Sequence, residues 1–186
     1  QDVYPESLSS QERISQESRV FRLLRKLDSF ISQRCKSLIV ISEHFRQIYI
    51  DTRSIPAERI HLIHNWIDTS SIQLKANGID FRSRFGISPD AFVLLYGGNI
   101  GVAAGVENVI SSFQYLQDLS TLHLIVAGAG PNLAVCRALT ERIAPDRIHF
   151  HTPWLQEETS AAMLSADVLV LPTRGNQSMA SVPSKL

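Results

Sequence analysis

The chain has 186 residues, in which 18 Lys and Arg side chains balance 18 Asp and Glu side chains. This zero net charge gives no support for nucleic-acid binding by overall charge. A hydrophobic content of 44% and a charged content of 19% are typical of a globular protein with one good core. No apolar run approaches the roughly 18 residues that a bilayer-spanning helix needs, so the sequence predicts no membrane span.

The two cysteines, Cys35 and Cys136, lie far apart and form no CxxC pair. They therefore indicate neither a disulfide framework nor a zinc site. A reducing cytoplasm is the simplest setting for such a chain. Because the sequence begins without Met and stops at Leu186, where a helix is about to begin, we expect an internal piece of a longer protein.

Cations crowd the first fifth of the chain. One interpretation of this pattern is a solvated helix face. The other is a surface that faces a polyanion or anionic lipid, the latter at the inner face of the plasma membrane. The cations are Arg13, Arg19, Arg22, Arg25, Lys26, Arg34 and Lys36.

The first part of the chain alternates helices with short β-rich runs. Residues 1–17 are polar and turn-rich, which predicts a loop. Residues 18–35 have apolar side chains near a 3.6-residue period and predict a helix. A strand is expected at 37–41, followed by a helix that Ser42 caps and that runs to about Ile50.

The middle of the chain is less regular. Residues 59–64 alternate and then give way to a polar stretch, 67–78, that has no clear period and is expected to be a linker. A short helix at 81–85 is closed by Gly86, a residue suited to the position after a helix.

From residue 91 onward, strands and helices alternate regularly. This pattern predicts an α/β fold with a Rossmann-like parallel sheet, right-handed crossovers and helices on both faces. Ligands of such sheets bind at the carboxyl ends of the strands. The expected strands are 91–96, 122–127, 147–150 and 167–171, the helices are 105–117, 131–143 and 156–164, and the loops that follow the strands are 97–105, 128–131, 151–155 and 172–185.

The first of these strands leads into a glycine-rich loop, 97–105, and then into a helix with an apolar stripe. Strand, glycine loop and helix together are typical of sites where backbone N–H groups bind a phosphate. The alternative is that the glycines only make tight turns for packing. Gly128 and Gly130, after the next strand, are expected to shape their turn rather than bind.

Five motifs occur in an order that matches one enzyme family. They are SLIVIS at 37–42, IHLIHNWID at 60–68, GGNIG with AG at 97–105, VAGAGP at 126–131, and ADVLVLP with VPSKL between 166 and 186. They resemble those of the retaining glycosyltransferases of the GT-B fold, family 4 (glycosyl transferases group 1). The opening DVYPE at 2–6 is similar to a subgroup that builds bacterial surface polysaccharides, including colanic-acid and amino-sugar transferases.

This resemblance implies a GT-B type protein in two parts. Residues 1–58 would end an acceptor-side domain, and residues 59–186 would form most of a nucleotide-sugar-binding domain, with the site between them. Such an enzyme moves a sugar, here a hexose or N-acetylhexosamine, from a nucleotide-diphosphate donor, expected to be UDP-linked, to a lipid-linked or saccharide acceptor. The family needs no bound metal and no cofactor, because N–H groups and cations stabilise the diphosphate.

The resemblance also selects candidate donor-binding residues but no catalytic residue. N–H groups from Gly98 to Gly101 would meet the diphosphate. Trp154 would stack on the base or only pack against the following helix. Lys185 and Arg174 are the expected phosphate cations, since the other cations after residue 85 lie away from the strand ends. The full set is Gly98, Asn99, Gly101, Gly105, Thr152, Trp154, Arg174, Ser178, Ser181, Ser184 and Lys185.

Four positions depart from the family pattern. Asn99 and Ala104 stand where the family usually has Arg and Lys, Val102 where the subgroup often has Arg, and Ala180 where the family has an acidic residue. A degenerate, non-catalytic nucleotide-sugar-binding module is therefore the alternative to an active transferase. A dinucleotide-binding oxidoreductase is disfavoured, because no GxGxxG with a later acidic residue follows the first strand.

Overall fold

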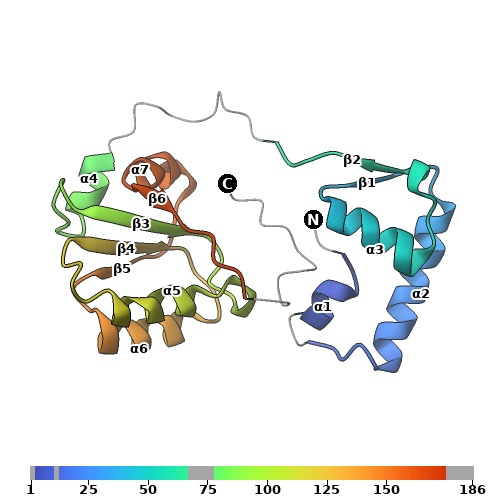
Figure 1. Ribbon diagram of the computed structural model, residues 1–186, viewed down its shortest axis with the longest axis horizontal. Coiled ribbons are helices and arrows are strands. Elements are labelled where there is room, and N and C mark those ends of the chain that lie inside the picture. Colours follow the sequence, from blue (N-terminus) through green and yellow to red (C-terminus); the bar gives the residue numbers. More distant parts are fainter. Residues whose placement is uncertain (1–2, 11–12, 67–77, 175–186) are drawn as a thin grey trace. The chain divides into compact units, whose positions relative to one another are not determined.

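The computed structural model describes residues 3–10, 13–66 and 78–174, which fall into two compact units (Figure 1). The first unit lies within residues 1–67 and the second within residues 68–174. The boundary predicted after residue 58 lies before the end of the first unit. Residues 60–62 still belong to that unit, because they pair with its strand at 38–40. No helix among the described residues is long and apolar enough to cross a membrane.

The first unit contains a two-stranded parallel sheet with helices. Leu38 pairs with Ile60 and Val40 with Leu62. The expectation of a loop over residues 1–17 is wrong in part, since a short helix forms there. The elements are α1 (Glu6–Ser10), α2 (Arg19–Arg34), β1 (Leu38–Val40), α3 (Glu43–Arg53), a 3₁₀ turn (Ala57–Arg59) and β2 (Ile60–Leu62).

Two serines cap the longer helices of this unit. The Ser18 hydroxyl accepts a hydrogen bond from the N–H of Phe21 at 3.0 Å, and Ser42 accepts one from the N–H of Phe45 at 3.2 Å. The predicted capping role of Ser42 is confirmed. Each cap satisfies a backbone donor that the first turn leaves free, which defines where the helix begins.

A buried arginine joins the three helices of the first unit. The Arg53 side chain, at the end of α3, is fully buried. Its guanidinium donates to Glu6 in α1 at 2.6 and 2.7 Å, and to Asp28 in α2 at 2.9 Å. Burial lowers the pKa of Arg53, but the hydrogen bonds with Glu6 and Asp28 outweigh it, so the pKa is raised. The guanidinium therefore stays charged and links segments that are far apart in sequence.

The second unit is a four-stranded parallel sheet in the order β5-β4-β3-β6, which confirms the predicted fold class. The β3 and β4 strands pair from Phe92–Leu122 through Gly97–Ala127. The elements are α4 (Gly78–Ser83), β3 (Phe92–Gly97), α5 (Val106–Ser112) with a 3₁₀ turn (Phe113–Tyr115), β4 (Leu122–Ala127), α6 (Leu133–Ile143), β5 (Ile148–His151), a 3₁₀ turn (Gln156–Glu158), α7 (Thr159–Leu164) and β6 (Val168–Leu169).

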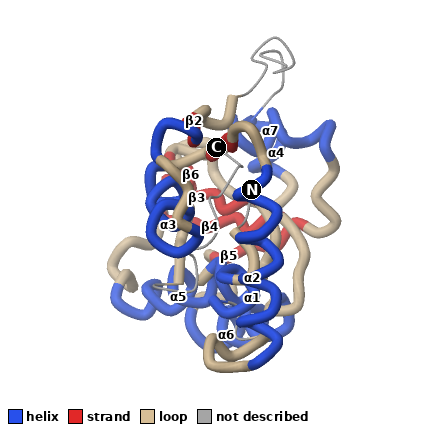
Figure 2. Tube along the Cα trace, turned by 90° about the vertical axis from the view of Figure 1, so that its right-hand side faces the viewer, coloured by secondary structure: helices blue, strands red, loops and turns tan. Residues whose placement is uncertain are grey.

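Apolar clusters lie on both faces of this sheet. On one face Leu124 and Val126 pack with residues of α5 and α6, such as Ile110. On the other face Val93 and Ile125 pack with residues of α4 and α7. The helices accordingly lie on opposite sides of the strands (Figures 1 and 2). A sheet that is covered on both faces explains why its strands are apolar without strict alternation.

Several predicted boundaries in the second unit differ from the structure. The short helix expected at 81–85 spans Gly78–Ser83. The helix expected at 105–117 ends at Ser112 and continues only as a 3₁₀ turn. Pro131 does not open a helix, because α6 begins at Leu133. The strand expected at 167–171 is shorter, since β6 spans only Val168–Leu169, although the N–H groups of Asp167 and Val170 also donate to the carbonyls of Val93 and Leu95 at 2.9 and 2.8 Å.

Candidate functional site

The candidate site lies at the edge of the second unit where all four strands end. Because these strands are parallel, their carboxyl ends meet at one edge of the sheet. The loops that follow β3, β4 and β5 and the segment after β6 therefore share this edge, as the sequence predicts.

Backbone hydrogen bonds join the loops after β3 and β4. The N–H of Gly98 donates to the carbonyl of Ala127 at 2.8 Å, and the N–H of Ile100 donates to that of Ala129 at 2.9 Å. The N–H of Asn132 donates in return to the carbonyl of Ile100 at 2.9 Å. The two loops thus form one continuous hydrogen-bonded layer.

The hydrogen bonds between the two loops occupy some of the N–H groups that were predicted to bind a phosphate. The N–H groups of Gly98 and Ile100 already have carbonyl partners, whereas those of Asn99 and Gly101 have none among the residues that the structure describes. The Asn99 side chain is exposed. The backbone carbonyl of Asn99 accepts a hydrogen bond from the Tyr96 hydroxyl at 2.7 Å. Of the predicted donors from Gly98 to Gly101, Asn99 and Gly101 are therefore the ones that remain available to a ligand.

The glycines of the second loop permit this close contact. A Cβ at Gly128 would lie 1.8 Å from the carbonyl oxygen of Gly98, and one at Gly130 would lie 2.4 Å from that of Ile100. Gly128 also has φ +139°, a conformation that side chains rarely adopt. These glycines set the spacing of the loops, in agreement with the shaping role expected for them.

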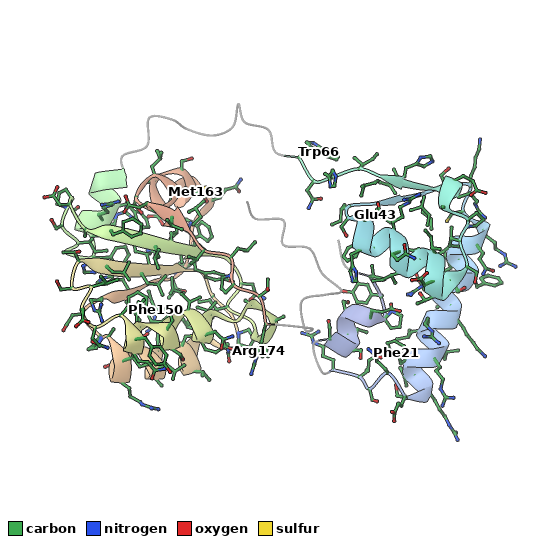
Figure 3. The ribbon with its side chains drawn as sticks, in the orientation of Figure 1. Phe21, Glu43, Trp66, Phe150, Met163 and Arg174 are labelled. Carbon is green, nitrogen blue, oxygen red and sulfur yellow. The ribbon has the colours of Figure 1, made fainter. Side chains whose placement is uncertain are left out.

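The segment after β6 lies against the glycine loop. The N–H of Arg174 donates to the carbonyl of Ala103 at 3.2 Å. Gly105, in the left-handed conformation before α5, would place a Cβ 3.4 Å from the backbone of Thr173. The structure thereby brings Arg174 beside the predicted phosphate loop, although the two lie far apart in the sequence (Figure 3).

Glu107, in the first turn of α5, is a residue of this site that the sequence reasoning missed. Its side chain is 14% exposed, and Oε1 lies 3.4 Å from Nη1 of Arg174. Its Oε2 accepts a hydrogen bond from the Asn132 amide at 3.1 Å. The available signal was an acidic side chain in the first turn after the glycine loop, a position that the helix dipole favours. A phosphate would have to compete with this carboxylate for Arg174.

The loop after β5 holds the predicted residues Thr152 and Trp154. Thr152 is exposed. The Trp154 ring packs so closely on Gly97 that a Cβ there would lie 2.3 Å from it. Trp154 also packs against the apolar cluster that contains Phe81 and Ile125. These contacts support the packing interpretation of Trp154, and its stacking on a base stays a prediction.

A hydrogen-bonded group fixes the start of the same loop. Nε2 of His151, the last residue of β5, lies 2.6 Å from Oε2 of Glu158. The Arg84 guanidinium donates to Oε1 of Glu158, also at 2.6 Å. The hydrogen bond from Arg84, and then that from His151, lowers the pKa of Glu158. No motif marks these residues, because they come together only when the sheet forms.

The remaining predicted residues, Ser178, Ser181, Ser184 and Lys185, lie outside the residues that the structure describes. The described part of the site thus consists of the two available N–H groups, the Asn99 side chain and Arg174 with its carboxylate partner.

Solved structures with this architecture are known. The chain superposes on WaaG, a glycosyltransferase involved in lipopolysaccharide biosynthesis, with a TM-score of 0.72, 19% identity and coverage of 93% of this chain and 48% of that one. It superposes on Anabaena HepE in complex with UDP-glucose with a TM-score of 0.69, 16% identity and coverage of 87% and 43%. The chain has the fold of a GT-B glycosyltransferase.

Sequence comparison agrees with the GT-B fold. A family model described as Glycosyltransferase Family 4 matches residues 7–71. The chain is 25% identical to the probable glycosyltransferase WbjE of Pseudomonas aeruginosa over 99% of this chain and 46% of that protein. It is also 25% identical to the putative colanic acid biosynthesis glycosyl transferase WcaI of Escherichia coli over 72% of this chain and 33% of that protein.

These matches confirm the resemblance that the motifs predicted, including the likeness to a colanic-acid enzyme. This GT-B chain spans less than half the length of each of the curated relatives and solved structures named here.

Proposed function

We propose that this GT-B chain is part of a glycosyltransferase that moves a sugar from a nucleotide-diphosphate donor to a lipid-linked or saccharide acceptor in bacterial polysaccharide biosynthesis. The observation that carries this proposal is the convergence of the loop after β3 and the segment after β6, which places the Asn99 and Gly101 N–H groups and Arg174 at one sheet edge. The names of WbjE and WcaI, and the UDP-glucose held by HepE, support it.

The chemistry of this edge suits a diphosphate leaving group. Negative charge develops on the diphosphate as its bond to the sugar breaks, and fixed N–H donors and a guanidinium stabilise such charge. Arg174 is about half exposed, so a ligand can reach it. Glu107 holds the guanidinium in place without a ligand, and the diphosphate would then replace the carboxylate as its partner.

Several finer points belong to the same proposal. The reaction retains the anomeric configuration, the sugar is a hexose or N-acetylhexosamine, the donor carries UDP, and no bound metal is needed. The first unit is the end of an acceptor-side domain, and the enzyme works in the cytoplasm at the inner face of the plasma membrane. Ser178, Ser181, Ser184 and Lys185 complete the donor site.

Calorimetric titration of the full-length protein with UDP and UDP-sugars tests the proposal. We expect UDP to bind, and Arg174→Gln to weaken that binding by about tenfold, because one charge-assisted contact of about 1.4 kcal/mol is lost. Lys185→Ala should have a similar effect. Arg137→Gln, an exposed position on α6, is the matched control and should leave the affinity unchanged. Absence of binding at millimolar UDP would contradict the proposal.

The alternative is a degenerate module that binds a nucleotide-sugar without transfer. The ion pair between Arg174 and Glu107 favours it, because the described cation beside the glycine loop is already partly neutralised. Asn99, Val102 and Ala104 supply no replacement charge. UDP-sugar binding without transfer or donor hydrolysis would support this alternative. Glu107→Gln should then raise UDP affinity, since the competing carboxylate is gone.

A further inference from the structure

The loop after β5 is closed at its base by two side chains. It follows His151, the last residue of β5, and it ends at Glu158 in the 3₁₀ turn before α7. Nε2 of His151 lies 2.6 Å from Oε2 of Glu158, although the two residues are seven positions apart in the sequence. Residues 152–157 therefore form a closed loop whose ends cannot separate unless this contact breaks.

Both side chains of this closure are attached to the core of the second unit. The Arg84 guanidinium donates to Oε1 of Glu158 at 2.6 Å and lies over the Phe81 ring, 5.2 Å from its centroid. The buried Phe81 ring also meets the His151 ring edge-on, with 5.1 Å between the centroids. Phe81 belongs to the apolar cluster that packs on one face of the sheet. We call Arg84, His151 and Glu158 together the loop clamp.

The clamped loop contacts both neighbouring loops of the sheet edge. The carbonyl of His151 accepts a hydrogen bond from the N–H of Gly128 at 2.9 Å, and Gly128 itself packs against the carbonyl of Gly98. Further along the loop, the Trp154 ring packs on Gly97 at the end of β3. The loop clamp thus fixes a loop that is joined to the glycine loop after β3 both directly and through the loop after β4.

The strand order places this loop to one side of the phosphate donors. Asn99 and Gly101 follow β3, and Arg174 follows β6, whereas β5 lies on the other side of β3, beyond β4 (Figure 1). Because neighbouring strands are roughly 4.8 Å apart, the loop after β5 begins about 10 Å from the loop after β3. It exposes Thr152 and Leu155. A diphosphate bound after β3 can therefore extend the rest of its nucleotide along the sheet edge to this loop.

We propose that Glu158 is a positioning residue for the donor, and that the loop clamp holds the loop after β5 in the shape that contacts the nucleoside part. This inference rests on the proposed function, because it takes the donor to be a nucleotide-diphosphate sugar. A loop that already has its bound shape loses little conformational entropy when the ligand binds, which raises the affinity. Glu158 acts through the loop, so its removal should affect binding of the nucleoside and not of the diphosphate.

Calorimetric titration of the full-length protein with UDP and, separately, with inorganic pyrophosphate tests this division. Glu158→Ala should weaken UDP binding by about tenfold, because the loop must then be ordered when the nucleotide binds. The same variant should bind pyrophosphate as the wild type does. Arg174→Gln should instead weaken the binding of both ligands, since its guanidinium faces the diphosphate.

Two further variants separate the loop clamp from the charge of this turn. Glu158→Gln should recover part of the lost UDP affinity, because its amide can still accept from Arg84 and donate to a neutral His151. Glu157→Ala removes the same charge from the neighbouring, exposed position of the same 3₁₀ turn, and it should bind UDP as the wild type does.

Hydrogen exchange without ligand measures the loop itself. In Glu158→Ala the backbone amides of residues 154–157 should exchange faster than in the wild type, whereas those of β3 and β4 should keep their protection. This pattern distinguishes a loosened loop from a second unit that is destabilised as a whole.

Two outcomes would overturn this inference alone. One is an unchanged UDP affinity in Glu158→Ala. The other is an equal loss of UDP and pyrophosphate binding together with faster exchange in β3 and β4, which would assign Glu158 a purely structural role. Absence of UDP binding by the wild-type protein would contradict the proposed transferase itself, and this inference with it, so the two failures are distinguishable.

Discussion

The two units of this chain each contain a buried arginine, but the arginines have different kinds of partner. Arg53 in the first unit is bound mainly by two carboxylates, Glu6 and Asp28. Arg82 in the second unit donates mostly to backbone carbonyls, at 2.6 Å to Ser165 and at 2.9 Å to Ala91. Arg82 also forms an ion pair with Asp167, whose side chain is 38% exposed.

The surroundings of these arginines explain the difference. The second unit has a sheet with apolar clusters on both faces. Its packing therefore depends less on the hydrogen bonds of Arg82. Among its described residues, the first unit has one small apolar cluster, around Val40 and Phe45. With little apolar area to bury, the packing of its helices depends more on the charged network of Arg53. A small core thus makes one polar group more important to stability.

The largest effect is expected from Arg53→Met, which breaks the charged network of the first unit. Two carboxylates would lose their partner, and removing one member of a buried ion pair costs about 3–5 kcal/mol. Hydrogen exchange should show lost protection in α2 and α3 and unchanged protection in β3 and β4. Arg46→Met, on the exposed side of α3, is the control and should cost less than about 1 kcal/mol.

Arg82→Met sharpens the same comparison. Its carbonyl partners lose hydrogen bonds but carry no charge, so we expect a cost of about 1–3 kcal/mol, confined to the second unit. A cost equal to that of Arg53→Met would contradict the view that the first unit depends more on its arginine.

A smaller effect is expected from Gly128→Ala, which breaks the contact between the loops after β3 and β4. The new Cβ would overlap the carbonyl of Gly98, and φ +139° strains any side chain. We expect about 2–3 kcal/mol of lost stability in urea unfolding, with a fall in UDP affinity. Gly86→Ala is the control: its φ is +67° with nothing within 4 Å of the new Cβ, so it should cost about 1 kcal/mol and leave UDP affinity unchanged.

The smallest effect concerns pH and a histidine pair in the second unit. His123 Nδ1 lies 3.1 Å from His149 Nε2, with the rings stacked. Burial, and then the nearby His123, lowers the pKa of His149 from 6.5 to about 4, and burial also lowers that of His123. Between these values the unfolded chain binds more protons, so stability should fall as pH drops from about 6.5 towards 4.

Urea unfolding at pH 7 and pH 5 measures this effect. The carboxyl group of Glu158, whose pKa is lowered, loses its contribution only at lower pH and does not interfere in this range. His149→Gln should unfold with a weaker dependence on pH, whereas His44→Gln, on the exposed side of α3, should behave as wild type. A pH dependence in His149→Gln as steep as that of the wild type would contradict the neutral, partly buried state of this histidine.

Local sequence patterns accounted for most of the elements. The cap predicted at Ser42 formed as a side-chain hydrogen bond, and the strand at 122–127 has the predicted bounds. These features depend on spacing and on short-range contacts. Residues 6–10 were expected to be a loop, because their polar sequence gives no apolar period, and Arg53 holds the helix there through Glu6.

The sequence by itself determined the parallel α/β sheet and the edge at which its loops meet, because apolar periodicity and glycine spacing are local properties of the chain. Only the tertiary structure decided which groups at that edge are available. The sequence suggested N–H donors from Gly98 to Gly101, but two of them bond to the neighbouring loop. It suggested Arg174 as a free cation, but Glu107 lies beside it. Both outcomes depend on contacts between segments far apart in sequence, which no local pattern encodes.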